Sequence, residues 1–236
     1  MANRYLPINV AVKYFPVLIV GGGKVALRKI ENLIDFNVDI TVIAPEISDK
    51  IEYHATKGRI KLEKRPYQSP EASKYGLVIS AANDEDVNRQ VYNDCHDNNI
   101  LVNVVDNPAL CTFIFPAMMK RDNLSVAIST DGKAPFLAAH LRLIMENLFP
   151  NHWSKIARLA ADYRNKVHQR WGGEEFIQQR FAALDRFLQA DWKQLIKIKS
   201  DDELQNELDQ LLEEPPPEEE EEEPTAESGS STNEKQ

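Results

Sequence analysis

The stretch that decides the fold is VLIVGGGKVALRKIENLID, residues 17–35. Its first four residues are apolar and mostly β-branched, three glycines follow, and residues 24–35 are compatible with a helix. This order predicts a buried strand, a tight turn and a helix. Gly21, Gly23 and Ala26 fit the pattern G-x-G-x-x-A where the strand meets the helix. At such a junction the pattern is typical of a loop that holds the pyrophosphate of a dinucleotide.

Each small residue of this loop has an expected role. Gly21 permits the sharp turn, Gly23 lets the backbone approach a pyrophosphate without a side chain in the way, and Ala26 allows close packing of helix on strand. The unpaired N–H groups at the start of the helix then face the anion. The alternative is a glycine-rich turn that binds nothing. We predict cofactor contacts from Gly21, Gly22, Gly23, Lys24 and Val25.

A second β-branched run, residues 39–44, predicts strand two, and it stops at Pro45 because proline cannot donate to a sheet ladder. An acidic residue at the tip of this strand would hold the adenosine ribose, and Glu46 lies two residues beyond the tip. We expect Pro45 and Glu46 to contact the cofactor, while the alternative is that Glu46 caps a helix starting near Ile47. The tip has no nearby arginine to pair with a 2′-phosphate, which favours NAD over NADP.

The remaining pattern predicts an α/β protein with a mostly parallel, Rossmann-like sheet. Beyond residue 132 the pattern becomes helical, with one helix over residues 135–149 and further helices over 152–212. Residues 215–236 combine a proline run, six consecutive glutamates and a Gly/Ser/Thr end, a composition that predicts disorder. Further strands are expected over residues 60–63, 77–81, 101–105 and 124–128, with helical stretches such as 84–98 between several of them.

Composition and charge exclude several classes of function. The formal net charge is −9, but residues 213–236 hold ten of the 37 acidic residues and one of the 28 basic ones, which leaves 27 of each sign in the rest. A neutral body lacks the basic face of nucleic-acid binders and the polybasic patch of membrane binders. No apolar run approaches the roughly 18 residues of a membrane span, and we expect neither a transmembrane segment nor export.

Cysteines and histidines argue against a resident metal. Cys95 and Cys111 are not spaced as CxxC, so neither a disulfide framework nor a structural zinc site is expected. No pair of histidines shows the HxxxH or HExxH spacing of a metal site. Two reduced thiols fit a cytoplasmic protein best, and we predict a cytoplasmic location and no metal site.

Four motifs occur in order along the chain: YLPI at residues 5–8, VGGGKVALRK at 20–29, NVVD at 103–106 and STDGKAP at 129–135. Together they resemble the precorrin-2 dehydrogenase/sirohydrochlorin ferrochelatase family, which includes the N-terminal half of siroheme synthases. The triple glycine alone would be weak evidence, but four motifs at matching intervals make a specific signal. The resemblance covers about residues 1–200.

The resemblance implies a domain organisation. A Rossmann-like NAD-binding domain would occupy residues 1–112, a small dimerisation region 113–149 and a helical C-terminal domain 150–212. The acidic tail, residues 213–236, falls outside the resemblance. The family further implies a homodimer whose active site lies between domains.

It also implies the reaction. Precorrin-2 loses hydride to NAD⁺ and protons to give sirohydrochlorin, and some members then insert Fe²⁺, a lyase reaction that yields siroheme. In members that do both, one aspartate of the NVVD segment serves each step, and by position this is Asp106. Asp106 follows an apolar strand, so it should sit where open α/β sheets bind ligands, and it could accept a proton there. The alternative is ordinary turn chemistry, because Asp-Asn-Pro initiates turns.

The substrate is a polycarboxylate, so the site should offer hydroxyls, amides and cations. The loop before the helix at residue 135 supplies the first two, and we predict substrate contacts from Ser129, Thr130, Gly132 and Lys133. Asp131 and Lys133 depart from the small residues common in the family at these positions. Cations near the motifs are Lys120, Arg121, Lys133 and Arg142, although any one of them alone reads more simply as a solvated surface charge.

Three other functions stay open from the sequence. The chain could be a dehydrogenase without ferrochelatase activity. It could be a non-catalytic NAD- or tetrapyrrole-binding regulatory module with the acidic tail as its partner-binding element, although the retained Asp106 argues against that. It could also be an unrelated Rossmann dehydrogenase of a small substrate, which would leave the later motifs unexplained.

Overall fold

The computed structural model describes residues 5–213. The predicted disordered tail lies outside these residues, apart from Glu213. The described chain divides into two compact units, one formed by residues 5–118 and 127–143 and the other by residues 119–126 and 144–213. The predicted domain boundaries at residues 112 and 149 stay predictions.

The first unit is built on a five-stranded sheet in the order β3-β2-β1-β4-β5. Every neighbouring pair is parallel, and Val17 of β1 lies opposite Ile40 of β2 on one side and Leu77 of β4 on the other. The strand order reverses at β1, and ligands of open α/β sheets bind at the carboxyl ends of the strands beside such a reversal. The predicted α/β class with a parallel sheet is confirmed. The strands are β1 (Val17–Val20), β2 (Ile40–Ile43), β3 (Lys61–Glu63), β4 (Leu77–Ser80) and β5 (Leu101–Val104).

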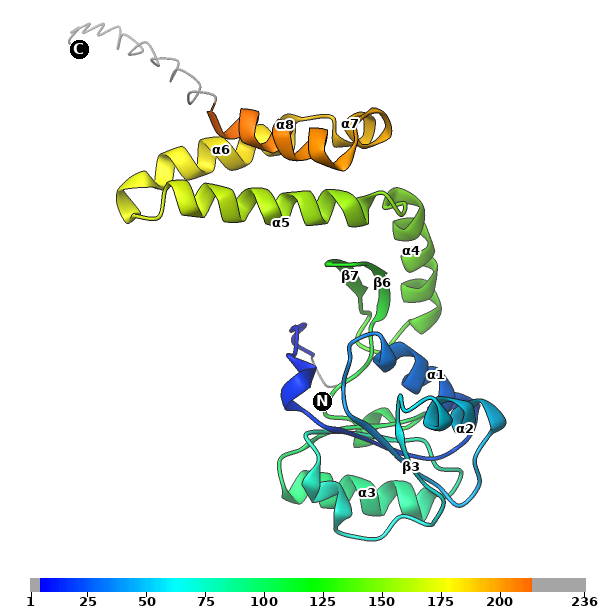
Figure 1. The fold of residues 1–236 in the computed structure, drawn as a ribbon. Helices are drawn as coiled ribbons and strands as arrows, with labels where there is room; N and C mark the ends of the chain where they lie inside the picture. The colour runs from blue at the N-terminus through cyan, green and yellow to red at the C-terminus, as the bar shows by residue number, and fades with distance from the viewer. Residues whose placement is uncertain (1–4, 214–236) are drawn as a thin grey trace, which may run out of the picture. The chain divides into compact units, whose positions relative to one another are not determined.

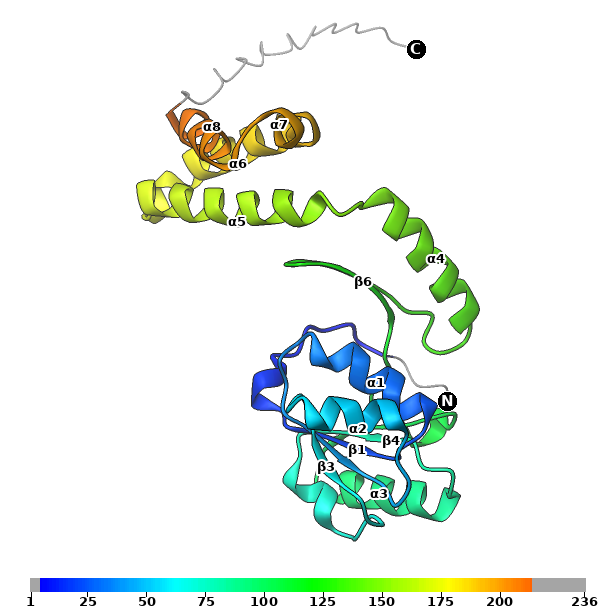
Figure 2. The ribbon, with the colours of Figure 1, turned by 45° about the vertical axis from the view of Figure 1, so that its right-hand side comes forward.

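Helices cover both faces of this sheet (Figures 1 and 2). The helices α1 (Lys24–Ile34) and α2 (Asp49–Thr56) lie on one face, and α3 (Glu85–Asp97) lies on the other. Alternate side chains of β1 divide between the two cores: Val17 packs with the α1 side and Leu18 with the α3 side. Short 3₁₀ turns occur at η1 (Val12–Tyr14), η2 (Glu71–Lys74) and η3 (Pro108–Leu110).

A two-stranded sheet and a helix follow. β6 (Ala117–Arg121) and β7 (Leu124–Ile128) pair through a two-residue connection that contains Asp122 at φ 55°. The sequence predicted β7 but not β6. The helix α4 (Pro135–Leu148) begins at the predicted proline.

The C-terminal part of the second unit, residues 144–213, is helical, as predicted. Its core contains the fully buried Tyr163, whose ring stacks on Phe187 at 5.5 Å, and Phe187 in turn stacks on Trp192 at 4.4 Å. Among residues 5–213, no helix is both long and apolar enough to cross a bilayer. The elements are α5 (Trp153–Arg170), η4 (Glu174–Phe176), α6 (Ile177–Gln189), α7 (Trp192–Ile198) and α8 (Asp201–Glu213).

Candidate active site

A cleft of about 570 Å³ opens at the carboxyl ends of β1, β2 and β4, where the strand order reverses. We call it the main cleft. Its walls come from the glycine loop after β1, the segment after β2, the segment after β3 and the loop after β4. Five of the predicted cofactor residues line it: Gly21, Gly22, Gly23, Pro45 and Glu46.

The three glycines of the loop differ in what a side chain would meet at each position. Gly21 has φ +127°, and a Cβ there would lie 2.3 Å from the carbonyl oxygen of Ala81. A Cβ on Gly22 would lie 1.9 Å from the carbonyl oxygen of Glu46. A Cβ on Gly23 would meet nothing within 4 Å. The first two glycines therefore let neighbouring backbones approach, and the third leaves open space at the main cleft.

Backbone hydrogen bonds fix the loop to both neighbouring strands. The N–H of Gly21 donates to the carbonyl of Ile43 at 3.0 Å, and the N–H of Ser48 donates to the carbonyl of Gly22 at 3.0 Å. On the other side, the N–H of Ala81 donates to Val20 at 2.7 Å. The position of the loop is thus set by β2 and β4 before any ligand arrives.

The helix α1 begins at this loop with Gly23 as its N-cap, and no side chain caps it. A helix start without a side-chain cap leaves N–H groups available to an anion. Ala26 is fully buried, as close packing of α1 on the sheet requires. Lys24 is exposed and Val25 half-buried, and neither lines the main cleft, so their predicted cofactor contacts stay predictions.

The segment after β2 rules out one alternative role for Glu46. The helix α2 begins at Asp49 with Ser48 as N-cap, so the reading of Glu46 as a helix cap is wrong. Glu46 is instead an exposed carboxylate on the cleft lining, next to the exposed Pro45. A carboxylate at this edge is the group that pairs with ribose hydroxyls in dinucleotide folds.

The wall after β4 was not predicted. Ala82, Asn83 and Asp84 line the cleft there. The side chain of Asn88 holds this loop, because its Nδ2 donates to the carbonyl of Ala82 at 3.0 Å and its Oδ1 accepts from Ser80 Oγ at 2.6 Å. The only sequence signal for it is a polar residue early in a helix, which is too common to single out.

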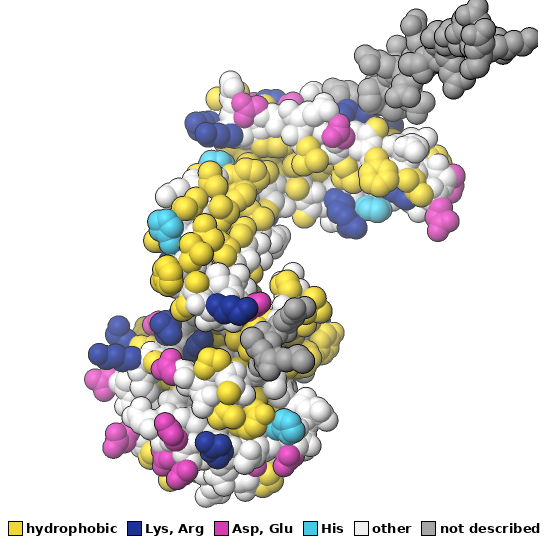
Figure 3. Space-filling view, turned by 180° about the vertical axis from the view of Figure 1, so that it is seen from behind, with side chains coloured by type: hydrophobic (Ala, Val, Ile, Leu, Met, Phe, Trp, Pro, Cys, Tyr) yellow, Lys and Arg dark blue, Asp and Glu magenta, His cyan; other side chains and the backbone are white. Residues whose placement is uncertain are grey.

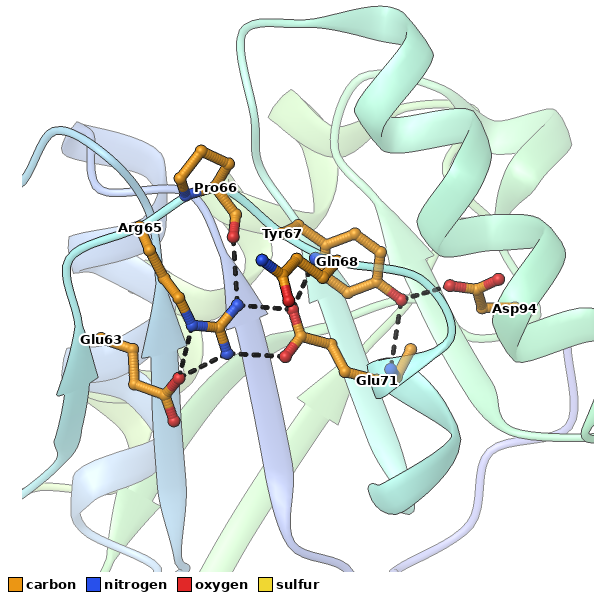
Figure 4. A network of polar contacts seen from close by, with 8 residues as sticks. Glu63, Arg65, Pro66, Tyr67, Gln68, Glu71 and Asp94 are labelled. Carbon is orange, nitrogen blue, oxygen red and sulfur yellow. Dashed lines mark hydrogen bonds and ion pairs between the residues drawn. The ribbon is translucent and has the colours of Figure 1, made fainter.

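Figure 4 shows how the wall after β3 is held. Tyr67, which lines the cleft and is 8% exposed, donates its hydroxyl to Asp94 of α3 and accepts the N–H of Ala72 at 3.1 Å. Asp94 also accepts from Ser69 Oγ at 2.7 Å. Burial, together with the hydrogen bond to Asp94, raises the pKa of Tyr67 well above its ordinary value. Tyr67 is thus a neutral, fixed part of the wall.

Arg65 lies in the same wall and is hydrogen-bonded within it (Figure 4). Its guanidinium donates to both oxygens of Glu71, at 2.9 and 2.7 Å, and to Glu63 through Nε at 2.9 Å. The hydrogen bonds from Arg65 lower the pKa of Glu71. A guanidinium held by two carboxylates is not positioned to pair with a ligand phosphate.

Asp106 follows β5 at the same carboxyl edge of the sheet, but it does not line the main cleft. It is exposed and has φ 59°, in the left-handed region. The N–H of Asn107 donates to Val104 at 3.3 Å, so the predicted turn is present as well. Non-glycine residues with positive φ are uncommon and cluster at functional sites, although aspartate and asparagine tolerate this conformation best. Its catalytic role stays a prediction.

Lys29 has an environment that the sequence does not single out. It lies on α1, half-buried, with its Nζ 4.0 Å from the ring centroid of Phe115. Burial, the largest cause, lowers the pKa of Lys29 to about 8, and the Asp106 carboxylate partly opposes the shift. The contact with Phe115 joins segments that are distant in the chain, so no spacing in the sequence reveals it.

In the STDGKAP loop the hydroxyls bind the loop's own backbone. Thr130 Oγ1 accepts the N–H of Ala134 at 3.0 Å, and Ser129 Oγ accepts the N–H of Asp131 at 3.1 Å. Gly132 has φ +74°, and both Gly132 and Lys133 are exposed. Among the other predicted cations, Arg121 donates to the carbonyls of Phe149 and Lys120, at 3.0 and 2.9 Å. Substrate contacts from Lys120, Arg121, Arg142 and this loop stay predictions.

Among residues 5–213, no group of three or more His, Cys, Asp and Glu side chains is placed to hold a metal ion.

Two consecutive regions of this chain match known family models. The family described as "Putative NAD(P)-binding" matches residues 8–117, and the family described as "Sirohaem biosynthesis protein central" matches residues 121–148. The two matches follow one another as the four motifs do. Residues 8–117 are therefore a Rossmann-like, NAD(P)-binding domain by fold, by the glycine loop and by family.

Curated relatives agree. The chain is 34% identical over 210 residues to the siroheme synthase of Nitrosococcus oceani, which covers 89% of this chain and 44% of that protein. It is 42% identical over 165 residues to the siroheme synthase of Methylococcus capsulatus, covering 70% of this chain and 35% of that protein. The chain therefore spans less than half the length of these relatives.

A solved structure shows the same fold. The chain of "SirC, precorrin-2 dehydrogenase" aligns with a TM-score of 0.70 at 23% identity, over 88% of this chain and 98% of that one. At this identity the likeness supports the fold alone. With two family matches in order and siroheme synthase relatives along most of its length, the chain is similar to the precorrin-2 dehydrogenase/sirohydrochlorin ferrochelatase family.

Proposed function

We propose that this chain is a cytoplasmic enzyme that uses NAD⁺ to oxidise precorrin-2 to sirohydrochlorin. The observation that carries the proposal is the main cleft, in which the unfilled Cβ position of Gly23 adjoins the uncapped start of α1. This is the arrangement that a pyrophosphate needs. Cys95 and Cys111 are both free, buried thiols, which is consistent with a reducing compartment.

The charges around the cleft favour NAD over NADP. Glu46 offers a carboxylate to the ribose hydroxyls and would repel a 2′-phosphate. Arg65, whose neighbour Pro66 lines the cleft, is already held by Glu63 and Glu71. NAD⁺ in this cleft supplies the acceptor for a hydride.

The chain itself supplies the rest of the chemistry. Hydride loss from the macrocycle leaves a proton to be removed, and Asp106, an exposed carboxylate at the carboxyl edge of the sheet, is the group we assign to accept it. We assign the hydroxyls of Ser129 and Thr130, together with Gly132 and Lys133 of the STDGKAP loop, to the substrate carboxylates. Gly132 and Lys133 are exposed, and the two hydroxyls accept backbone N–H groups, which leaves their O–H groups to donate to a ligand.

Turnover is tested by incubating the purified chain with enzymatically made precorrin-2 and either NAD⁺ or NADP⁺, while NADH formation and the macrocycle spectrum are followed. We expect sirohydrochlorin to appear with NAD⁺ and much more slowly with NADP⁺. Binding of NAD⁺ and precorrin-2 without turnover would favour the regulatory module instead. A clear preference for NADP⁺ would contradict the assignment of Glu46.

Ferrochelatase activity is the extension that the family suggests. Metal insertion releases two pyrrole protons, and Asp106 is the candidate to accept them. Fe²⁺ would then be a substrate and not a resident metal. Adding Fe²⁺ or Co²⁺ to sirohydrochlorin and the chain, with a metal-only control, decides this step, because only a chelatase raises the rate above the control.

We further propose that the chain forms a homodimer through α4. Hydrophobic side chains gather along this helix (Figure 3). Phe136 is 78% exposed and Leu148 59% exposed, although large apolar side chains gain free energy from burial. Light scattering on the purified chain should give twice the mass of the chain. Leu143→Glu, at a 50% exposed position, should then yield monomers without loss of helical content.

A further inference from the structure

The loop after β5, which carries Asp106, is closed by residues 111–113, which we call the return segment. The N–H of Thr112 donates to the carbonyl of Val102 at 2.8 Å, and Thr112 Oγ1 accepts the N–H of Val102 at 2.8 Å. At the start of the loop, the N–H of Val105 donates to the last carbonyl of β4 at 2.9 Å. Both ends of the loop are therefore attached to the sheet, and Asp106 lies between them.

Asn103 attaches the return segment to the interior of β5. Its side chain is polar, yet the residue is only 8% exposed. Its Nδ2 donates to the carbonyl of Phe113 at 3.0 Å and to Sγ of Cys111 at 3.6 Å. The two N–H groups of one carboxamide make both bonds at the same time. Because a buried amide costs free energy unless it is hydrogen-bonded, these bonds hold the return segment in place.

Cys111 connects the return segment to the turn itself. Its thiol is buried and donates to the carbonyls of Val104 and Asn107, at 3.2 and 3.3 Å. Burial raises the pKa of Cys111, so the thiol keeps its proton at neutral pH and remains a donor. The two carbonyls that share this S–H precede and follow Asp106 in the chain. We call the side chains of Asn103 and Cys111, with these bonds, the Asp106 clamp.

The backbone of Asp106 needs such support. Its φ of 59° lies in the left-handed region, which costs a residue other than glycine free energy and persists where the surroundings fix it. The hydrogen bond of the turn itself, from Asn107 N–H to the carbonyl of Val104, is long at 3.3 Å. A turn that relaxed to negative φ would point the carboxylate in another direction. A general base must lie within hydrogen-bond reach of the proton that it accepts.

We propose that Asn103 and Cys111 are positioning residues, which hold Asp106 in the left-handed conformation from which its carboxylate accepts the proton of precorrin-2. The inference rests on the proposed function and names residues that act on the rate through Asp106. In this assignment neither side chain contacts the substrate, because both are buried and bonded to the chain's own backbone. A loosened clamp therefore lowers kcat and leaves the binding of both ligands intact.

Substitutions of the clamp test this effect. Asn103→Leu keeps the approximate size of the side chain and removes both donors. We expect kcat for sirohydrochlorin formation to fall about tenfold to a hundredfold, with KM for precorrin-2 and NAD⁺ affinity within a few-fold. Cys111→Ala should lower kcat less, because a thiol is a weak donor. Cys111→Ser should keep more of the rate than the alanine variant, since a hydroxyl donates to the same carbonyls.

Cys95→Ala is the matched control. It removes a buried, free thiol from the same core cluster that contains Cys111, but from α3, and kcat should be unchanged. If Asn103→Leu does not fold, the comparison of Cys111→Ala with Cys111→Ser and Cys95→Ala carries the test. An equal loss of kcat in Cys95→Ala and Cys111→Ala would overturn the proposal in favour of core packing. Wild-type kcat in the folded clamp variants would overturn it as well.

A double-mutant cycle with Asp106→Asn tests whether the clamp acts through the carboxylate. Asparagine cannot accept the proton, so Asn103→Leu or Cys111→Ala should lower turnover little further in that background. An equal fold loss in both backgrounds would overturn the proposal, because the clamp would then act on something other than Asp106.

Backbone chemical shifts distinguish failure of this inference from failure of the proposed function. The ¹³C shifts of Asp106 differ between a left-handed and an extended backbone, and NMR measures them whether or not the chain turns over precorrin-2. We expect the left-handed values in the wild type and in Cys95→Ala, and a displacement toward extended values in Asn103→Leu and Cys111→Ala. Unchanged shifts in the clamp variants would overturn the inference alone. Displaced shifts together with wild-type turnover in Asp106→Asn would support the clamp and refute the proton transfer assigned to Asp106.

Discussion

Gly22 and Glu46 lie so close that a Cβ on Gly22 would sit 1.9 Å from the carbonyl oxygen of Glu46. The contact joins the glycine loop to the segment after β2, and Glu46 lines the main cleft with its neighbour Pro45. The hydrogen bond from Ser48 N–H to Gly22 closes the same junction. The glycine at the variable position of G-x-G-x-x-A is therefore required by the chain's own packing.

Gly22→Ala should destabilise the first unit. Because the obstructing atom belongs to the backbone, the loop or the segment after β2 must move, and we expect a loss of about 2 kcal/mol or more in the free energy of unfolding. The measurement is a urea denaturation curve, with NAD⁺ affinity measured in parallel. A variant as stable as the wild type would show that the two segments separate easily.

Gly23→Asp should have the opposite effect to Gly22→Ala: it should abolish NAD⁺ binding and leave the stability of the fold intact. Gly23 is the N-cap of α1 with φ −88° and ψ −168°, a conformation in which aspartate is a good cap, so stability should hold or rise. The added carboxylate faces the pyrophosphate, and calorimetry should detect no NAD⁺ binding. Gly23→Asn is the uncharged control and should bind more tightly than the aspartate variant. Equal NAD⁺ binding by both variants would show that the pyrophosphate does not lie at this position.

The sequence predicted the elements whose signal is local. Residues 17–20 are buried and mostly β-branched, and β1 occupies the predicted residues without change. Strand β6 was missed because its apolar pair, Met118 and Met119, is too short to indicate a strand. The close contact of Gly22 with Glu46 and the environment of Lys29 depend on segments distant in the chain. No local pattern encodes them, so only the fold reveals them.

Tyr67→Phe tests the wall after β3. The change leaves Asp94 without one donor and the N–H of Ala72 without its acceptor, and we expect a loss of about 1–3 kcal/mol in stability. Since the pKa of Tyr67 is raised on folding, its contribution is present below the ordinary tyrosine value of about 10 and lost as the pH rises above it. Denaturation curves at pH 7 and above pH 10 should show the difference between variant and wild type shrinking.

The backbone of Asp106 decides how its catalytic role should be tested. At φ 59°, alanine would add backbone strain of about 1 kcal/mol to the loss of the carboxylate, so Asp106→Ala alone confounds the two. Asparagine has nearly the same shape, tolerates the left-handed region and removes the negative charge. Glycine tolerates the conformation and removes the side chain altogether.

Asp106→Asn should therefore keep the fold and NAD⁺ affinity while losing about 10²- to 10⁴-fold in sirohydrochlorin formation, the range typical of a removed general base. Asp106→Gly should lose as much, and Asp106→Ala should lose as much per folded molecule with lower stability. Turnover of precorrin-2, NAD⁺ binding and thermal unfolding are measured on the same preparations. Near wild-type turnover in the asparagine variant would make Asp106 a turn residue and pass the proton to water or to a carboxylate of the substrate. If dehydrogenation survives and only metal insertion fails, Asp106 serves chelation alone, because hydride loss would then need no base at this position.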